Sequence, residues 1–188
     1  MTEAVDYGPL AALIGTWRGD KGMDTSPEPD GTEQNPYYET LLFEASGDVT
    51  NAEEQTLAVV RYHQVVTRQR DDKVFHNETG YWLWNAADGS IVQVFAIPRG
   101  VSVVAGGRVN DHGQIEVRAA VDDPDWSIAQ TPFMRQKART VAFEHRVGVS
   151  GDTLVYDELT KLEIYVRSFD HTDSNTLYLS LSADPGIR

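Results

Sequence analysis

The stretch LIGTWRG, residues 13–19, decides how the rest of the chain is interpreted. A short apolar run over residues 9–14 leads into Gly15, Trp17 and Gly19, which follow one another at two-residue spacing. Side chains alternate across a strand, so these three residues share one face. Glycine weakens a strand unless a backbone or a ligand must approach closely. The pattern predicts either a tryptophan that plugs the end of a small barrel or an ordinary first strand with one core tryptophan.

Composition limits the class of protein. The chain has 188 residues, enough for one domain with a sizeable core, and we predict a single β-barrel domain over residues 1–188 with a tail at 1–8. Sixteen basic residues stand against 29 acidic ones, for a net charge of −13, which argues against nucleic acid and membrane surfaces as partners. There is no cysteine, no secretory signal and no apolar run long enough to span a membrane, so we expect a cytoplasmic protein.

Short β patterns separated by turn residues dominate the chain. The expected strands cover residues 15–22, 37–45, 55–70, 74–85, 90–97, 101–109, 114–121, 137–149, 153–167 and 176–182. Ten strands at near-regular spacing predict an all-β fold, either an up-and-down antiparallel barrel of the lipocalin and fatty-acid-binding type or a sandwich.

Three segments depart from this β pattern. Residues 9–14 begin with proline and predict a short helical turn that caps the barrel. Residues 23–36, rich in Pro, Gly, Asp and Ser, predict a long acidic loop. Residues 122–136 carry two prolines and the apolar Trp126, Phe133 and Met134, so they predict a loop insertion with a helical turn, either held by core contacts or acting as a lid over a ligand.

The strand over 74–85 carries the densest set of candidate site residues. His76, Glu78, Gly80, Trp82 and Trp84 share one parity, so together they line either the interior or the outside. If they face inward, the cavity holds an imidazole, a carboxylate and two indoles. An outward-facing indole pair would instead form an external patch or the face of a homodimer.

The remaining histidines differ in their sequence context. His112 lies in a turn and His145 lies between two charged residues, so both are expected on the outside. His63 lies in a strand and would form a small metal site with His76 and Glu78 if both strands present the same face. His171 precedes the last expected strand, where an imidazole can reach over the rim as a ligand for iron or zinc.

Four stretches, in this order, resemble nitrobindin and the haem-binding domain that it shares with THAP-type proteins. Residues 13–19 resemble the opening G-x-W-x-G motif, and residues 74–81 (VFHNETGY) resemble an H-x-E-x-G-Y motif. Residues 150–157 (SGDTLVYD) are similar to a G-D-x-L-x-Y-D hairpin, and Asp170-His171 through Leu177 resembles the segment that carries the axial histidine. The likeness spans nearly the whole chain.

The resemblance implies a ten-stranded barrel that holds haem b near its mouth. It implies that His171 is the axial ligand and therefore the metal ligand, and we expect Trp17, His76 and Trp82 as further cofactor-binding residues. In this family ferric haem binds nitric oxide, and peroxynitrite isomerisation is an activity ascribed to some members.

This chain departs from the family pattern near the expected haem. Where the family continues with alternating glycines and a Tyr-Pro pair, residues 20–27 read DKGMDTSP, and Asp170 replaces a proline. Haem propionates beside Asp20, Asp24, Asp170 and Asp173 would meet like charge.

Three hypotheses follow, and different observations separate them. The first is a haem-binding barrel that handles nitric oxide or peroxynitrite. The second is a metal-free carrier of a fatty acid or another apolar ligand, with Arg61 as the partner of a carboxylate. The third is a small enzyme that uses His63, His76 and Glu78.

Overall fold

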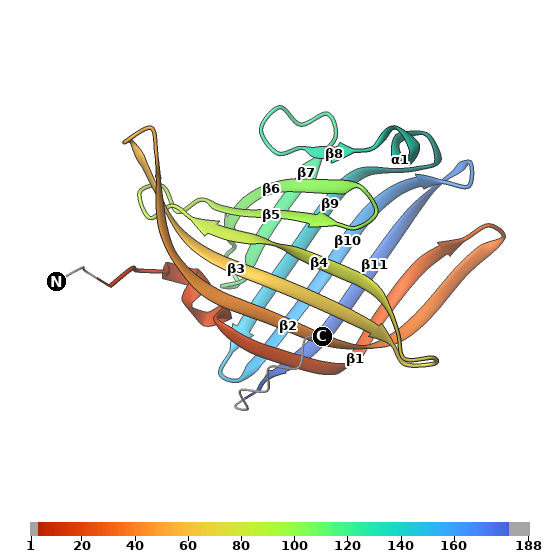
Figure 1. The fold of residues 1–188 in the computed structure, drawn as a ribbon, viewed down its shortest axis with the longest axis horizontal. Helices are drawn as coiled ribbons and strands as arrows, with labels where there is room; N and C mark the ends of the chain where they lie inside the picture. Colours follow the sequence, from red (N-terminus) through yellow and green to blue (C-terminus); the bar gives the residue numbers. More distant parts are fainter. Residues whose placement is uncertain (1–3, 181–188) are drawn as a thin grey trace.

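The computed structural model describes residues 4–180, and its strands close into an antiparallel barrel (Figure 1). Its elements are η1 (Gly8–Leu13), β1 (Gly15–Glu28), β2 (Gly31–Asn51), β3 (Gln55–Arg68), β4 (Lys73–Trp84), β5 (Ile91–Ile97), β6 (Val101–Val109), β7 (Ile115–Ala120), β8 (Ile128–Gln130), α1 (Pro132–Lys137), β9 (Ala138–Ser150), β10 (Thr153–Ile164) and β11 (Arg167–Leu179). No described helix is long and apolar enough to cross a membrane.

Ten strands form the closed wall, as the sequence predicts. Sequential neighbours pair from β1 to β7, β7 pairs with β9, β9 continues through β10 to β11, and β11 returns to β1. The eleventh strand, β8, pairs with β6 beyond the end of β7. The Gln130 side chain also bonds the backbone of Thr140 on β9, so β8 helps to fill the gap between β6 and β9.

Trp17 closes one end of the barrel together with η1. Its side chain is 1% exposed, and its Nε1 donates to the Leu13 carbonyl oxygen at 2.7 Å. A Cβ on Gly15 would lie 2.7 Å from Leu179 Cδ1, and a Cβ on Gly19 would lie 2.7 Å from the Thr176 carbonyl oxygen. Both glycines therefore allow β11 to approach closely. This explains why glycine occurs within the strand at these two positions.

The predicted loop at 23–36 is wrong, because most of this segment is strand. β1 runs to Glu28 and β2 begins at Gly31, so only two residues remain for the turn. The polar residues that suggest a loop bond one another inside the hairpin: the Asn35 amide and the Ser26 hydroxyl both donate to Asp24. Polar side chains that find partners inside the barrel do not oppose a strand.

The segment at 122–136 contains both a loop and short regular elements. It holds β8 and most of α1, and Thr131 caps α1 through a bond from the Met134 amide. Trp126 and Met134 pack against the core, whereas Phe133 is exposed. The predicted helical turn is therefore present, and core contacts hold this segment against the barrel.

The last strand begins earlier than predicted, at Arg167 instead of Thr176. His171 therefore lies within β11 and not in a loop before a strand. The hairpins β1–β2 and β10–β11 lie at the end of the barrel opposite η1 (Figure 1). Residues 181 and 182 of the predicted strand lie outside the described residues.

Candidate site at the open end of the barrel

His171 contacts two carboxylates on neighbouring strands. Its Nε2 lies 2.6 Å from Asp24 Oδ1 on β1 and 3.2 Å from Asp173 Oδ2 on its own strand. Asp24 and Asp173 pair directly across β1 and β11, so the sheet register itself brings these groups together. We call these three residues the Asp24–His171–Asp173 cluster.

Asp24 is held firmly in place. Its side chain is 3% exposed, and its Oδ2 accepts from Asn35 Nδ2 at 2.8 Å and from Ser26 Oγ at 2.9 Å. Oδ1 is therefore the oxygen that faces His171. Asn35 is 3% exposed, and its Oδ1 has no hydrogen-bond partner among the described residues.

The three groups of the cluster shift one another's protonation. Burial lowers the pKa of His171, but the hydrogen bond to Asp24 and the charges of Asp173 and Asp24 outweigh it, so the pKa is raised. Burial raises the pKa of Asp24, but bonds from His171 and Asn35 outweigh it and lower the pKa. Burial raises the pKa of Asp173 to about 6. The cluster therefore favours a protonated imidazole beside an ionised Asp24.

His76 and Glu78 face the interior, which answers the question that the parity of β4 leaves open. Glu78 is 3% exposed, His76 Nε2 lies 3.5 Å from Glu78 Oε2, and the Tyr62 hydroxyl donates to Glu78 Oε1. Burial lowers the pKa of His76, but the hydrogen bond and charge of Glu78 outweigh it and raise the pKa. The register places both histidines at the same end: His76 pairs with Val66, Val66 pairs with Glu39 on β2, and four residues before Glu39 lies Asn35, the cross-strand partner of Asp24.

The predicted cofactor-binding residues do not all meet at one place. Trp17 pairs with Leu179, eight positions along β11 from His171, which is about 26 Å at about 3.3 Å per residue. Trp82 is 1% exposed and lies six positions from His76 along β4, with its ring 5.7 Å from that of His145. The structure therefore brings together His171 and His76, while Trp17 closes the opposite end and Trp82 lies in the buried core.

The two inner tryptophans belong to the core and do not form an outer patch. Trp82 is buried, and Trp84 is half-buried and packs against the core cluster. A Cβ on Gly8 would lie 2.5 Å from the Trp84 ring, so η1 covers this indole. This pair offers no face for a homodimer.

His145 faces inward, whereas its sequence context suggests the outer face. Because the strand alternates, its charged neighbours Glu144 and Arg146 lie outside and the imidazole between them lies inside. Its Nδ1 lies 3.0 Å from Gln93 Oε1, and burial lowers its pKa to about 4. The enclosed cavity that it lines is about 10 Å³, room for about one water molecule. His112, in contrast, is exposed in its turn, as predicted.

Glu39 is a buried acid that the sequence does not single out. It is 3% exposed and accepts from Gln64 Nε2 at 2.7 Å, from the Tyr156 hydroxyl at 2.9 Å and from Asn175 Nδ2 at 2.7 Å. Burial raises its pKa to about 7, because these three bonds only partly compensate for the lost water.

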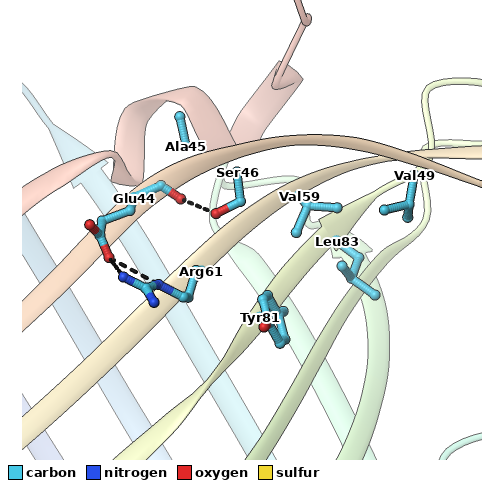
Figure 2. Close-up of a pocket in the computed structure, with 8 residues that line it drawn as sticks. All are labelled: Glu44, Ala45, Ser46, Val49, Val59, Arg61, Tyr81 and Leu83. Carbon is cyan, nitrogen blue, oxygen red and sulfur yellow. Dashed lines mark hydrogen bonds and ion pairs between the residues drawn. The ribbon is translucent and has the colours of Figure 1, made fainter.

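Two residues from the alternative hypotheses face outward. His63 Nε2 lies 3.0 Å from Asn77 Oδ1 on the outer face, so His63 does not join His76 and Glu78. Arg61 pairs with Glu44 in a shallow outer groove, as Figure 2 shows, so it lies on the wrong side of the wall for a ligand inside the barrel. The predicted His63/His76/Glu78 set and the predicted buried arginine are therefore both wrong.

The strands close into a β-barrel, and ionisable side chains lie inside the end that is opposite η1. The chain belongs to the family described as THAP4-like, heme-binding beta-barrel domain, whose family model matches residues 6–178. This match confirms the resemblance seen in the sequence motifs. Among solved structures, the crystal structure of Rv2717c from M. tuberculosis is similar with a TM-score of 0.65 and 22% sequence identity, covering 93% of this chain and 99% of that one. No curated protein matches this chain.

The residues around His171 do not fit haem iron. Asp24 Oδ1 and Asp173 Oδ2 lie only 2.6 Å and 3.2 Å from His171 Nε2, so the two carboxylates leave no room for a haem ring around an iron bound to that nitrogen. Propionates would add negative charge near Asp24 and Asp173. Two arginines near this end could pair with propionates, but both already have partners. Arg68 bonds Asp71, and Arg99 bonds the Phe75 carbonyl oxygen.

Proposed function

We propose that this barrel binds a small, positively charged ligand at the end opposite η1. The observation that carries the proposal is the Asp24–His171–Asp173 cluster, in which two carboxylates converge on a single imidazole nitrogen inside the barrel. A cationic ligand would compensate for the acidic excess of this end, whereas an anionic ligand would add to it.

The acidic excess extends beyond the cluster. Five carboxylates lie on the inner faces of neighbouring strands, against the two imidazoles of His76 and His171; the acids are Asp24, Glu39, Glu78, Glu158 and Asp173. Burial, together with the charges of Glu78, Asp173 and Glu39, raises the pKa of Glu158 well above its ordinary value. Added positive charge would relieve this mutual repulsion.

Haem b ligated by His171 is the ligand that the resemblance predicts, and the family description names haem. For this chain we infer a different ligand, because the carboxylates of Asp24 and Asp173 lie too close to the imidazole nitrogen for a haem ring, whereas a small cation could contact all three groups. Nitric oxide and peroxynitrite chemistry would depend on bound haem, so neither forms part of the proposal. The fatty-acid hypothesis requires an arginine inside the barrel to pair with the carboxylate of the ligand. Arg61 does not meet this requirement, because it pairs with Glu44 on the outer face.

A haemin titration tests the proposal. We expect the wild-type protein to give no sharpened Soret band that depends on His171. We expect Asp24→Gly, which removes the carboxylate nearest to His171 Nε2, to bind haemin at least about tenfold more tightly. This corresponds to about 1.4 kcal/mol or more.

The controls separate ligation from a general change in charge. Glu28→Gly removes an exposed acid from the same strand and should leave haemin binding as in the wild type. Adding His171→Ala to Asp24→Gly should abolish the gain. Tight binding of haemin by the wild type that His171→Ala removes would overturn the proposal and favour haem.

A further inference from the structure

We infer that the Asp24–His171–Asp173 cluster is a binding site for a divalent first-row transition metal ion of the Zn²⁺ class. This inference rests on the proposed function, because it identifies the positively charged ligand of the same end. Each residue offers one ligand atom, and the three atoms lie within 4.8 Å of one another.

The spacing of the donor atoms suits a metal ion. Tetrahedral Zn²⁺ with bonds of about 2.0–2.2 Å places neighbouring ligand atoms about 3.3 Å apart. His171 Nε2 lies 3.2 Å from Asp173 Oδ2 and 2.6 Å from Asp24 Oδ1, so a small outward movement of one carboxylate would admit the ion. The imidazole would lose its proton to the solvent and present its lone pair to the metal.

The barrel wall positions two of the ligands before any metal binds. Asp24 and Asp173 are cross-strand partners in the β1–β11 pair, and His171 lies two positions from Asp173 on the same inner face. Ser26 and Asn35 hold the outer oxygen of Asp24. Hydrogen bonds of this kind orient ligands in known metal sites.

Asn35 anchors one side of the cluster. Its side chain is 3% exposed, and its amide nitrogen donates to Asp24 Oδ2, Ser26 Oγ and Glu33 Oε2. These bonds hold the Asp24 carboxylate so that Oδ1 is the oxygen that faces His171. A buried amide that orients a ligand oxygen in this way is typical of metal sites.

The donor set also indicates the class of ion. One imidazole and two carboxylates, with no thiolate because the chain has no cysteine, favour Zn²⁺ or Mn²⁺ over copper(I) and iron–sulfur clusters. An all-oxygen set would favour Ca²⁺ or Mg²⁺. Three protein ligands leave one position for water or a small ligand, as in catalytic zinc sites.

Isothermal titration calorimetry with Zn²⁺ on the full chain, after treatment with a chelator, tests the inference. We expect one ion per chain and at least about tenfold weaker binding in Asp173→Asn, which keeps the shape of the side chain and removes its charge. His171→Ala should abolish stoichiometric binding, and Asn35→Ala should weaken it about tenfold by releasing Asp24. Co²⁺ should give visible d–d bands in the wild type that His171→Ala removes.

His112→Ala is the matched control, because it also removes one imidazole but takes it from an exposed turn outside the cluster. It should leave Zn²⁺ binding unchanged. Absence of a stoichiometric site, or binding that survives both Asp173→Asn and His171→Ala, would overturn the inference. The haemin titration distinguishes the failure of this inference from the failure of the proposed function. A Soret band that depends on His171 would overturn the proposed function. If haemin gives no such band and Zn²⁺ does not bind either, only the metal site is overturned. Circular dichroism of each variant confirms that it folds.

Discussion

Trp17→Ala is expected to lower the free energy of unfolding by about 4 kcal/mol, the largest effect of any single substitution proposed for this protein. The side chain is 1% exposed and packs with Leu10 and Leu13 of η1. Truncation would leave a cavity at the closed end and remove the bond from Nε1 to the Leu13 carbonyl oxygen. Urea denaturation of the variant and the wild type measures the difference.

Two comparisons make the Trp17 prediction specific. Trp17→Phe keeps most of the apolar volume but loses the hydrogen bond, so we expect a loss between those of the wild type and Trp17→Ala. Tyr81→Ala removes an aromatic side chain from the outer face, where it is 46% exposed, and should cost less than about 1 kcal/mol. A loss from Trp17→Ala as small as that from Tyr81→Ala would show that this tryptophan does not close the barrel.

Glu39→Gln is expected to remove a pH-dependent loss of stability. The pKa of Glu39 is raised by burial from 4.5 to about 7 in the folded protein. A raised folded pKa contributes stability that is fully present below the unfolded pKa and is lost as pH rises through the folded value. At about 1.4 kcal/mol per unit, the wild type should lose about 3 kcal/mol from this group between pH about 4 and pH about 8.

The variant carries no charge at this position, so it should not suffer this loss. The difference in unfolding free energy between Glu39→Gln and the wild type should therefore move by about 3 kcal/mol in favour of the variant over that pH range. Asp173 and His145 also titrate there, but both proteins contain them, so the difference between the two proteins reports the charge at position 39 together with its effect on Asp173. Glu163→Gln, on an exposed side chain, should show no such trend. A pH-independent difference for Glu39→Gln would contradict the prediction.

The wall of the barrel could be predicted from sequence because its apolar residues alternate and its turns are short. The motif at residues 13–19 predicted a plugging tryptophan as one of two alternatives and the close approach of a backbone or a ligand, and the structure shows the plug and identifies β11 as the strand that approaches. The inward face of β4 also follows from parity once one member is placed, since Glu78, Gly80 and Trp82 are all buried. The family model, which matches residues 6–178, covers all of these features.

The polar end could not be predicted in the same way. In β1 a bulge between Gly19 and Gly22 shifts the register, so Trp17 and Asp24 both face inward although their numbers differ in parity. In β11 the run from Asp170 to Asn175 has the composition of a loop, yet its alternate residues His171 and Asp173 line the interior. The spacing of these residues at period two was a signal for a strand here. Buried polar side chains are stable only when they bond partners on other strands, however, and the sequence alone does not show those partners.

The Asp24–His171–Asp173 cluster is best tested by the anomalous scattering of crystals soaked with Zn²⁺. The account predicts one strong peak bonded to Asp24 Oδ1, His171 Nε2 and Asp173 Oδ2, and no such peak in crystals of Asp173→Asn. A structure in which those three atoms stay unmetallated while His171 ligates the iron of a bound haem would contradict it.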